Sequence, residues 1–402
     1  MGFLCLFSSL NAGQSGLFTY ELAKGSVTIT DYPDDAVGAV AVPEEFDGHP
    51  VTSIGKNAFW SCEKLTSVAL PLGLTTIGEH AFSGCSKLTR ITIPPKVTSI
   101  ENSTFFQCNG LIHVTIPPGV TSIGRHAFFE CTELEEIVLP SSLTTIAGAA
   151  FDRCTKLDKL TIPASVTTIG EGAFDSCFQL RSIEVEPENT SFLSVDGVLF
   201  NADRSELIHY PAAKPGTFVI PAGITTIERR MFNYQNDLTR VSIPASVTSV
   251  GDIDGYSAFS HCYRLSSIEV APENRHYSSI AGVLFNADHT KIIRCPARRS
   301  GDYVIPPGVT EIEDHAFAQC SQLTSITIPP GVIAIGNHAF SGCSGLKEIT
   351  TPPSVTRIGC GVFQQCRQLT RVTLSKNITR MDYGTFWDCR KLTHVELPPD
   401  IT

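Results

Sequence analysis

Cysteine is the residue whose spacing in this sequence first suggests chemistry. Six cysteines from Cys62 to Cys177 lie 23 residues apart, and four from Cys320 to Cys389 repeat that spacing. Cys262 lies 58 residues before Cys320. Regularly spaced thiols could bind soft metals or pair as disulfides, but zinc sites normally show C-x-x-C or mixed Cys/His spacing. Because each of these cysteines follows a phenylalanine by three residues, we interpret the column as small, free core thiols.

The cysteines outside this column have a different expected environment. Cys295 and Cys360 do not follow the repeat, and we expect both to be accessible. Cys5 lies in residues 1–15, an apolar segment of signal-peptide length that lacks a basic beginning. Gly13 and Ser15 suit a cleavage after Ser15, so we expect export, with an unstructured chain start as the alternative.

Histidines form a second column, two residues before the phenylalanine. Its members are His80, His126, His315 and His338. His315 and His338 belong to adjacent repeats and should lie roughly 5 Å apart. Their only acidic neighbours are Glu313 and Asp314, too few for a convincing metal site. We therefore expect solvated turn residues, and no metal or other cofactor.

A threonine column and the overall charge limit the remaining chemistry. Threonine follows valine in most repeats, a pattern that suits either ice binding or, as we favour, cross-strand pairing in a β ladder. The sequence has no G-x-S-x-G, P-loop, H-E-x-x-H or calcium-loop motif, so no enzyme is predicted. The net charge is −10, and no basic run exceeds a pair, which argues against nucleic-acid binding.

The elements that position these columns come from one repeated unit. Its form is L-x-x-I-x-I-P-x-x-V-T-x-I-G-x-x-A-F-x-x-C, and its clearest copy runs from Leu88 to Cys108. The L-x-x-I-x-I segment has strand periodicity, and proline ends it. A second short strand follows at V-T-x-I. A period in the low twenties predicts a solenoid in which each turn stacks on its neighbours around a continuous core. The expected core residues are Phe82, Phe105, Phe128, Phe151, Phe174, Phe317, Phe340, Cys85, Cys108, Cys131, Cys154, Cys177, Cys320 and Cys343.

The repeat resembles the leucine-rich repeats of the BspA-like class. The residues that carry this resemblance are I-P-x-x-V-T-S-I-G-x-x-A-F-x-x-C, as from Ile116 to Cys131, and it covers the chain from about Val40 onward. The resemblance implies a β-rich, right-handed leucine-rich-repeat superhelix with short strands on its concave face. It also implies a surface protein, since relatives are associated with adhesion to host matrix proteins and with co-aggregation.

Two longer repeats interrupt the period. Residues 183–228 and 268–313 align at an offset of 85, and each carries an Asn-Ala-Asp between apolar runs that predicts a β-hairpin insert. The predicted organisation begins with a candidate signal peptide (1–15) and a capping hairpin (16–39). Three solenoid segments follow (40–182, 229–267 and 314–402), separated by the two long repeats (183–228 and 268–313). The last solenoid segment stops in mid-repeat.

Outward positions of the L-x-x-I-x-I strands do not repeat as the core columns do. This variation is what a binding surface on a rigid scaffold would show, although unselected solvated residues would show it too. The candidate concave binding face comprises Arg90, Thr92, His113, Thr115, Glu136, Lys159, Thr161, Arg240, Glu269, Glu348, Arg371 and His394.

These observations predict a secreted or cell-surface repeat protein that binds a protein or glycan, such as extracellular matrix or another cell surface. We expect a monomer, no membrane span and no nucleic-acid partner. The alternative is a structural spacer, or the repeat portion of a larger protein whose functional domain lies elsewhere.

Overall fold

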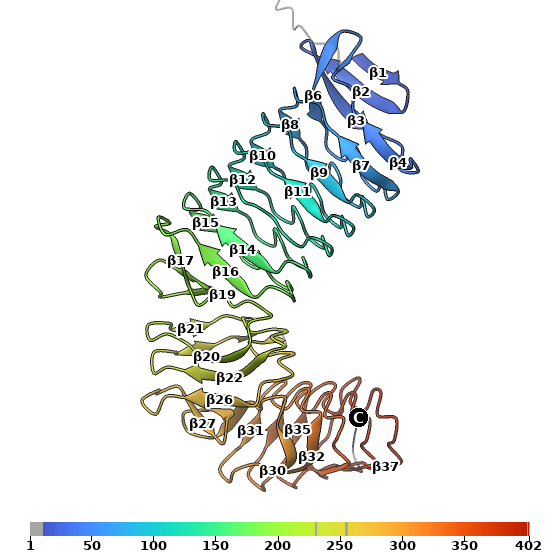
Figure 1. The fold of residues 1–402 in the computed structure, drawn as a ribbon. Helices are drawn as coiled ribbons and strands as arrows, with labels where there is room; N and C mark the ends of the chain where they lie inside the picture. The colour runs from blue at the N-terminus through green and yellow to red at the C-terminus, as the bar shows by residue number, and fades with distance from the viewer. Residues whose placement is uncertain (1–10, 230, 254–255, 400, 402) are drawn as a thin grey trace, which may run out of the picture. The chain divides into compact units, whose positions relative to one another are not determined.

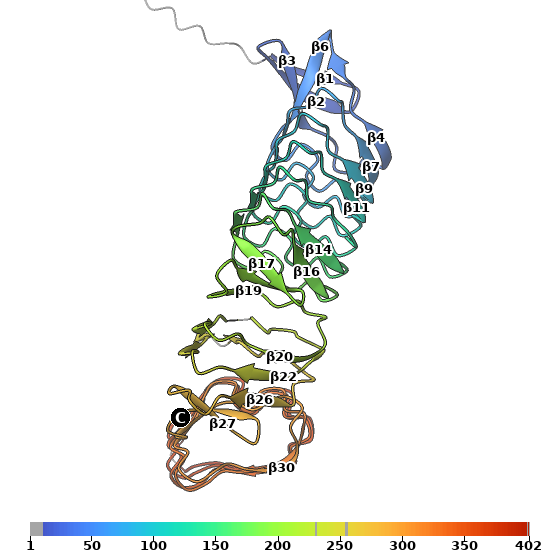
Figure 2. The ribbon, with the colours of Figure 1, turned by 60° about the vertical axis from the view of Figure 1, so that its left-hand side comes forward.

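Stacked turns of about 23 residues make up this protein. The structure, a computed structural model, describes residues 11–229, 231–253, 256–399 and 401. It divides into two units, Met1–Ala202 and Asp203–Thr402. The described residues form strands and turns without any helix, which confirms the predicted β-rich solenoid (Figure 1). Figure 2 views the later turns of the second unit, from about β30 onward, nearly end-on.

The first unit has two walls of short parallel strands. Along one wall, which we call the strand face, outward and buried residues alternate as the I-x-I pattern requires. The strand face contains β4 (Gly38–Ala41), β7 (Leu65–Ala69), β9 (Arg90–Thr92), β11 (His113–Thr115), β14 (Lys159–Ile162) and β16 (Ser182–Val185). The opposite wall contains β6 (His49–Ile54), β8 (Thr76–Ile77), β10 (Ser99–Ile100), β12 (Ser122–Ile123), β13 (Thr145–Ile146) and β15 (Thr168–Ile169).

The second unit repeats this arrangement. Its strand face contains β20 (Gly216–Val219), β22 (Leu238–Ile243), β26 (Ser267–Val270), β30 (Ser300–Val304), β32 (Gln322–Thr327), β34 (Glu348–Thr350), β36 (Arg371–Thr373) and β37 (His394–Glu396). The opposite wall contains β21 (Thr226–Ile227), β23 (Ser249–Val250), β29 (Lys291–Arg294), β31 (Glu311–Ile312), β33 (Ala334–Ile335) and β35 (Arg357–Ile358). The unit also contains the short strands β19 (Leu207–His209), β24 (Asp252–Ile253) and β25 (Tyr256–Ser257), and the hairpin strands described below.

Phenylalanine and cysteine side chains form the centre of each unit. All fourteen core residues named from the sequence are buried, none more than 1% exposed. The phenylalanine rings stack on one another, with 5.4 Å between the centroids of Phe105 and Phe128. Most column thiols also donate to the phenylalanine carbonyl of the preceding turn, as Cys131 Sγ does to Phe105 O at 3.2 Å. Cys62 and Cys320, which each follow an irregular segment, donate to other backbone carbonyls. Cysteine is therefore a hydrogen-bond donor here as well as an apolar residue.

Threonine hydroxyls act in the same way along the surface. Thr121 Oγ1 donates to Thr98 O at 3.2 Å, and Thr144 Oγ1 donates to Thr121 O at 3.0 Å. These bonds join successive turns by side-chain-to-backbone contact. The threonine column thus has a structural explanation in turn stacking.

The histidine column occupies a backbone conformation that few residues adopt. His80, His126, His315 and His338 have φ between 51° and 56°, the left-handed region. Histidine is among the residues enriched there, and glycine occupies the same position at Gly172 and elsewhere. The recurrence of histidine therefore follows from the turn geometry.

Ala149 occupies this same position and provides a test. Its φ is 54°, so replacement Ala149→Gly should raise the free energy of unfolding by about 0.5–1 kcal/mol, because relief of left-handed strain outweighs glycine's entropy cost. Urea denaturation followed by circular dichroism measures the change. Ala164→Gly is the matched control, since Ala164 does not have a positive φ and should lose stability. A loss of stability in Ala149→Gly as well would contradict the strain argument.

Each long repeat contains a hairpin whose turn precedes the Asn-Ala-Asp segment and was not predicted from the sequence. In the first, β17 (Phe192–Val195) pairs with β18 (Val198–Asn201) around Asp196 and Gly197, both at positive φ. This is the Asp-Gly hairpin turn. In the second, β27 (Tyr277–Ile280) pairs with β28 (Val283–Asn286) in the same way. There β28 also pairs with β29 antiparallel, the two runs that flank Asn-Ala-Asp. Each hairpin therefore begins earlier than predicted.

The N-terminal cap differs from the predicted single hairpin. Three antiparallel strands form it, in the order β1 (Asn11–Ser15), β2 (Phe18–Ala23) and β3 (Ser26–Asp31). β3 then pairs with β6 of the first turns, and β5 (Glu45–Phe46) pairs with β6 from its other side. A cleavage after Ser15 would remove β1 from this sheet. The rest of the candidate signal segment, residues 1–10, lies outside the described residues.

Of the two cysteines outside the column, Cys295 is not accessible, contrary to expectation, and Cys360 is partly accessible. Cys295 is fully buried, because it follows β29 into the core beside Cys320. Cys360 is half-buried, with its Sγ 3.7 Å from His338 Nε2. The described part of the chain has no disulfide.

Candidate functional site

The residues of the predicted binding face lie on the outer side of the strand faces. Eleven of the twelve are exposed, and Glu269 is half-buried. In the first unit Arg90 lies beside His113, and Thr92 lies beside Thr115, in register across β9 and β11. The structure thus forms short columns of polar side chains within each unit.

In the second unit the predicted residues form two separate groups. Arg240 Nη1 and Glu269 Oε1 are 3.0 Å apart and form an ion pair. Glu348, Arg371 and His394 lie side by side on β34, β36 and β37. β32 pairs with β30 and is not paired with β34, so these two strand groups are not one continuous ladder.

The parallel ladder of the first unit is interrupted at one turn of its strand face. β11 pairs with β9 and β14 pairs with β16, while residues 136–139 between them join neither ladder. On the opposite wall the same turns stay paired through β12, β13 and β15. The interruption is therefore confined to the strand face.

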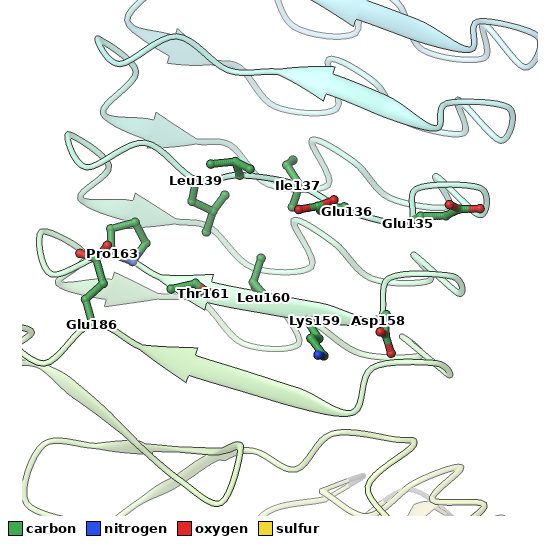
Figure 3. A pocket seen from close by; sticks show the side chains of 11 residues that line it. Glu135, Glu136, Ile137, Leu139, Asp158, Lys159, Leu160, Thr161, Pro163 and Glu186 are labelled. Atoms are coloured by element: carbon green, nitrogen blue, oxygen red, sulfur yellow. The ribbon is translucent and has the colours of Figure 1, made fainter.

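A pocket of about 530 Å³ occupies this interruption (Figure 3). At one end the two turns remain joined, where Asp158 N donates to Glu135 O at 3.4 Å. Beyond that point the pocket reaches the buried residues Ile137 and Leu160. Its full lining is Glu135, Glu136, Ile137, Val138, Leu139, Asp158, Lys159, Leu160, Thr161, Pro163 and Glu186.

Negative charge dominates this pocket, with four carboxylates and one ammonium among its lining residues. Asp158 is paired with Arg181 at 3.3 Å, and Glu186 Oε2 accepts from the backbone N–H of Ala164 at 2.8 Å. Glu136 and Lys159 form no ion pair within the described residues, and both are exposed. The arrangement suits a ligand group that combines an apolar stem with a positive charge.

Sequence reasoning found only part of this site. It named Glu136, Lys159 and Thr161, and it missed Glu135, Asp158 and Glu186. The adjacent acidic residues Glu135 and Glu136 were the available signal. Nothing in the repeat pattern, however, indicates that the ladder opens at this turn.

The two histidines of adjacent turns lie side by side. The rings of His315 and His338 stack with 5.1 Å between centroids, near the predicted separation. Burial is the main cause that lowers the pKa of His315 to about 4, and the neighbouring His338 adds to it. No group of three or more potential metal ligands occurs within the part of the chain that the structure describes. Nor does that part contain a helix capable of crossing a membrane.

Comparison with known sequences gives the family. The model of the BspA type leucine rich repeat region matches six copies, over residues 52–181, 212–298 and 299–402. The chain belongs to the BspA-type leucine-rich repeat family. No curated protein matches this BspA-type chain.

Solved structures share the fold of this BspA-type protein. A leucine rich cell surface protein from Faecalibacterium prausnitzii A2-165 is 27% identical with a TM-score of 0.55, covering 96% of this chain and 95% of its own. A leucine-rich repeat protein from Bacteroides ovatus ATCC 8483 is 26% identical with a TM-score of 0.53, over 96% and 95%. The pneumococcal vaccine antigen PcpA, 20% identical with a TM-score of 0.51 over 98% and 86%, is similar in fold. The first is described as a cell surface protein, the second as a repeat protein and the third as a vaccine antigen, and none of the three is described as an enzyme.

Proposed function

We propose that this BspA-type protein is a non-catalytic surface or secreted adhesion protein that binds a protein partner through the strand face of its first unit. Its similarity to a structure described as a cell surface protein supports the location. The exposed polar columns of β9, β11 and β14 support a binding role for this face. Loops and strands that vary on a constant scaffold commonly carry recognition.

The pocket beside residues 136–139 is the observation that carries the proposal. It has an apolar floor at Ile137 and Leu160, and carboxylates at its rim. A lysine or arginine of the partner can pack its stem on such a floor while its charge meets Glu136. Backbone groups that lack ladder partners can in addition bond an extended peptide. The preferred partner is therefore a protein with a basic, extended segment.

Replacement of one pocket carboxylate tests this proposal. Glu136→Gln should weaken binding to an immobilised extracellular-matrix protein about tenfold, since a hydrogen bond to a charged group contributes about 1.5–3 kcal/mol. Biolayer interferometry at two salt concentrations gives the affinity and its ionic component. The weakening should shrink at high salt because the exposed charges are screened.

Glu188→Gln is the matched control, because Glu188 is exposed in the first unit and does not line the pocket. It removes the same charge and should change the affinity less than twofold. Equal losses in both variants would contradict a specific role of the pocket. No binding to any matrix protein by the unaltered chain would favour a spacer role instead.

A further inference from the structure

Arg294 is a buried arginine in the second unit, where most buried positions are apolar and the other buried polar side chains are uncharged. It ends β29 and is 2% exposed. Its guanidinium donates to three carbonyls: Nη1 to His315 O at 2.6 Å, and Nη2 to Phe259 O at 3.2 Å and to Ala318 O at 3.3 Å. These bonds join turns on either side of the second long repeat.

Capping these carbonyls does not require a charge. In regular turns a neutral cysteine thiol donates to the corresponding phenylalanine carbonyl, as Cys343 does to Phe317 O at 3.2 Å. In the turn that lacks this cysteine, neutral Gln235 Nε2 donates to Tyr210 O at 3.0 Å. The positive charge of Arg294 therefore needs a separate explanation.

The charge of Arg294 has no counter-ion in the described chain. None of the ion pairs formed by described residues includes Arg294. Its Nε is buried and has no hydrogen-bond partner. A guanidinium has five N–H groups, and only three are accounted for by the carbonyls. Buried charges are normally paired, because their desolvation is costly.

A pocket of about 370 Å³ borders this guanidinium. Apart from Arg294 and Ala318, all its lining residues are serine, glutamine or histidine, and none is acidic. Burial is the first cause that lowers the pKa of His261 and His315, with Arg294 contributing to both. At neutral pH these rings are uncharged and can still donate one N–H each. The pocket is thus rich in donors around one unpaired cation.

We propose that the pocket beside Arg294 binds a tetrahedral oxyanion, either inorganic phosphate or the phosphate of a larger molecule. Such an ion supplies the missing negative charge, and its several oxygens can accept from donors on different sides. The cavity exceeds the size of a bare oxyanion and leaves room for the remainder of a phosphorylated ligand. This site lies in the second unit and does not depend on the strand face of the first.

The test measures saturable binding of sodium phosphate to the full chain, by isothermal calorimetry and by thermal shift at constant ionic strength. We expect saturation in phosphate and in sulfate and none in chloride. The same measurement with glycerol phosphate distinguishes the free ion from a phosphorylated molecule. An affinity equal to that of inorganic phosphate indicates the free ion, and a higher affinity indicates a phosphorylated ligand. Absence of saturable binding up to tens of millimolar in all these arms would overturn the proposal.

Variants locate the binding. Gln319→Glu places a carboxylate in the pocket as an internal counter-ion and should weaken phosphate binding at least tenfold while the chain stays folded. Gln322→Glu adds the same charge at an exposed position on β32 and should bind as the unaltered chain does. Arg294→Met should abolish binding. Equal phosphate affinity in Gln319→Glu and Gln322→Glu would overturn the assignment, whether or not Arg294→Met folds.

Discussion

The first unit should lose most of its stability when the pH rises from 7.5 to 9.5. Its six column thiols from Cys62 to Cys177 are buried, and burial is the first cause that raises the pKa of each. For Cys62 the pKa rises to about 12. In the unfolded chain the same thiols ionise with a pKa of about 8.5.

The sign of the effect follows from proton linkage. Above pH 8.5 the unfolded chain releases thiol protons that the folded chain keeps, so rising pH favours unfolding. The stabilisation is fully present below the unfolded pKa and is lost as the pH approaches the raised folded values. At pH 9.5 each thiol contributes a loss of about 1.4 kcal/mol, so six contribute about 8 kcal/mol. That is comparable with the roughly 5–15 kcal/mol that stabilises a typical folded domain.

Urea midpoints at pH 7.5, 8.5 and 9.5 under a non-thiol reductant measure this loss. Below pH 9.5 most tyrosine and lysine side chains remain protonated, so the thiols dominate the slope. Cys131→Ala should be less stable at pH 7.5, because it loses the bond to Phe105 O, but its stability should fall less with pH. A midpoint independent of pH would show that the column thiols are not sequestered from solvent.

Phe128→Ala should destabilise the first unit by about 3–5 kcal/mol, the usual loss for a large aromatic residue in a core. The Phe128 ring is fully buried and stacks between Phe105 and Phe151, with centroid distances of 5.4 and 5.3 Å. Turns of a solenoid interact only with their neighbours, so a weakened interface can divide the unfolding transition. We therefore expect a lower urea midpoint and a broader or divided transition by circular dichroism.

The adjacent Phe129 is the matched control. It is half-buried and stacks on Phe106 at 4.9 Å outside the central column. Phe129→Ala removes the same atoms and should cost only about 1 kcal/mol, because its ring is already partly exposed to water in the folded chain. Stability losses of equal size in the two variants would contradict the claim that the central phenylalanine stack contributes more to stability than the outer one.

Much of the fold could be predicted because the repeat makes its signal redundant. Phenylalanine and cysteine recur at one spacing, and each turn has the same environment as its neighbours, so one correct assignment extends to the whole column. The cap and the inserts were predicted less well because each occurs once or twice. The additional cap strand β1 and the Asp196–Gly197 turn were therefore not predicted from the pattern.

The candidate sites depend on departures from the repeat, which the pattern itself cannot locate. Glu136 was chosen from its outward position, but its neighbours Glu135 and Asp158 became part of a site only because the ladder opens there. The repeat pattern gives Arg294 no particular role. Its burial without a counter-ion appears once turns distant in sequence are stacked around it.

The sequence alone determined the stacking period, the residues that face the core and the family, because these follow from spacing and side-chain type. Tertiary structure decided which hydrogen bonds the core cysteines make, where the strand ladder is interrupted and which charge lacks a partner. Those features depend on contacts between residues about 23 or more positions apart, such as Cys131 with Phe105 and Arg294 with Phe259. Local pattern carries no information about such contacts where the repeat is broken.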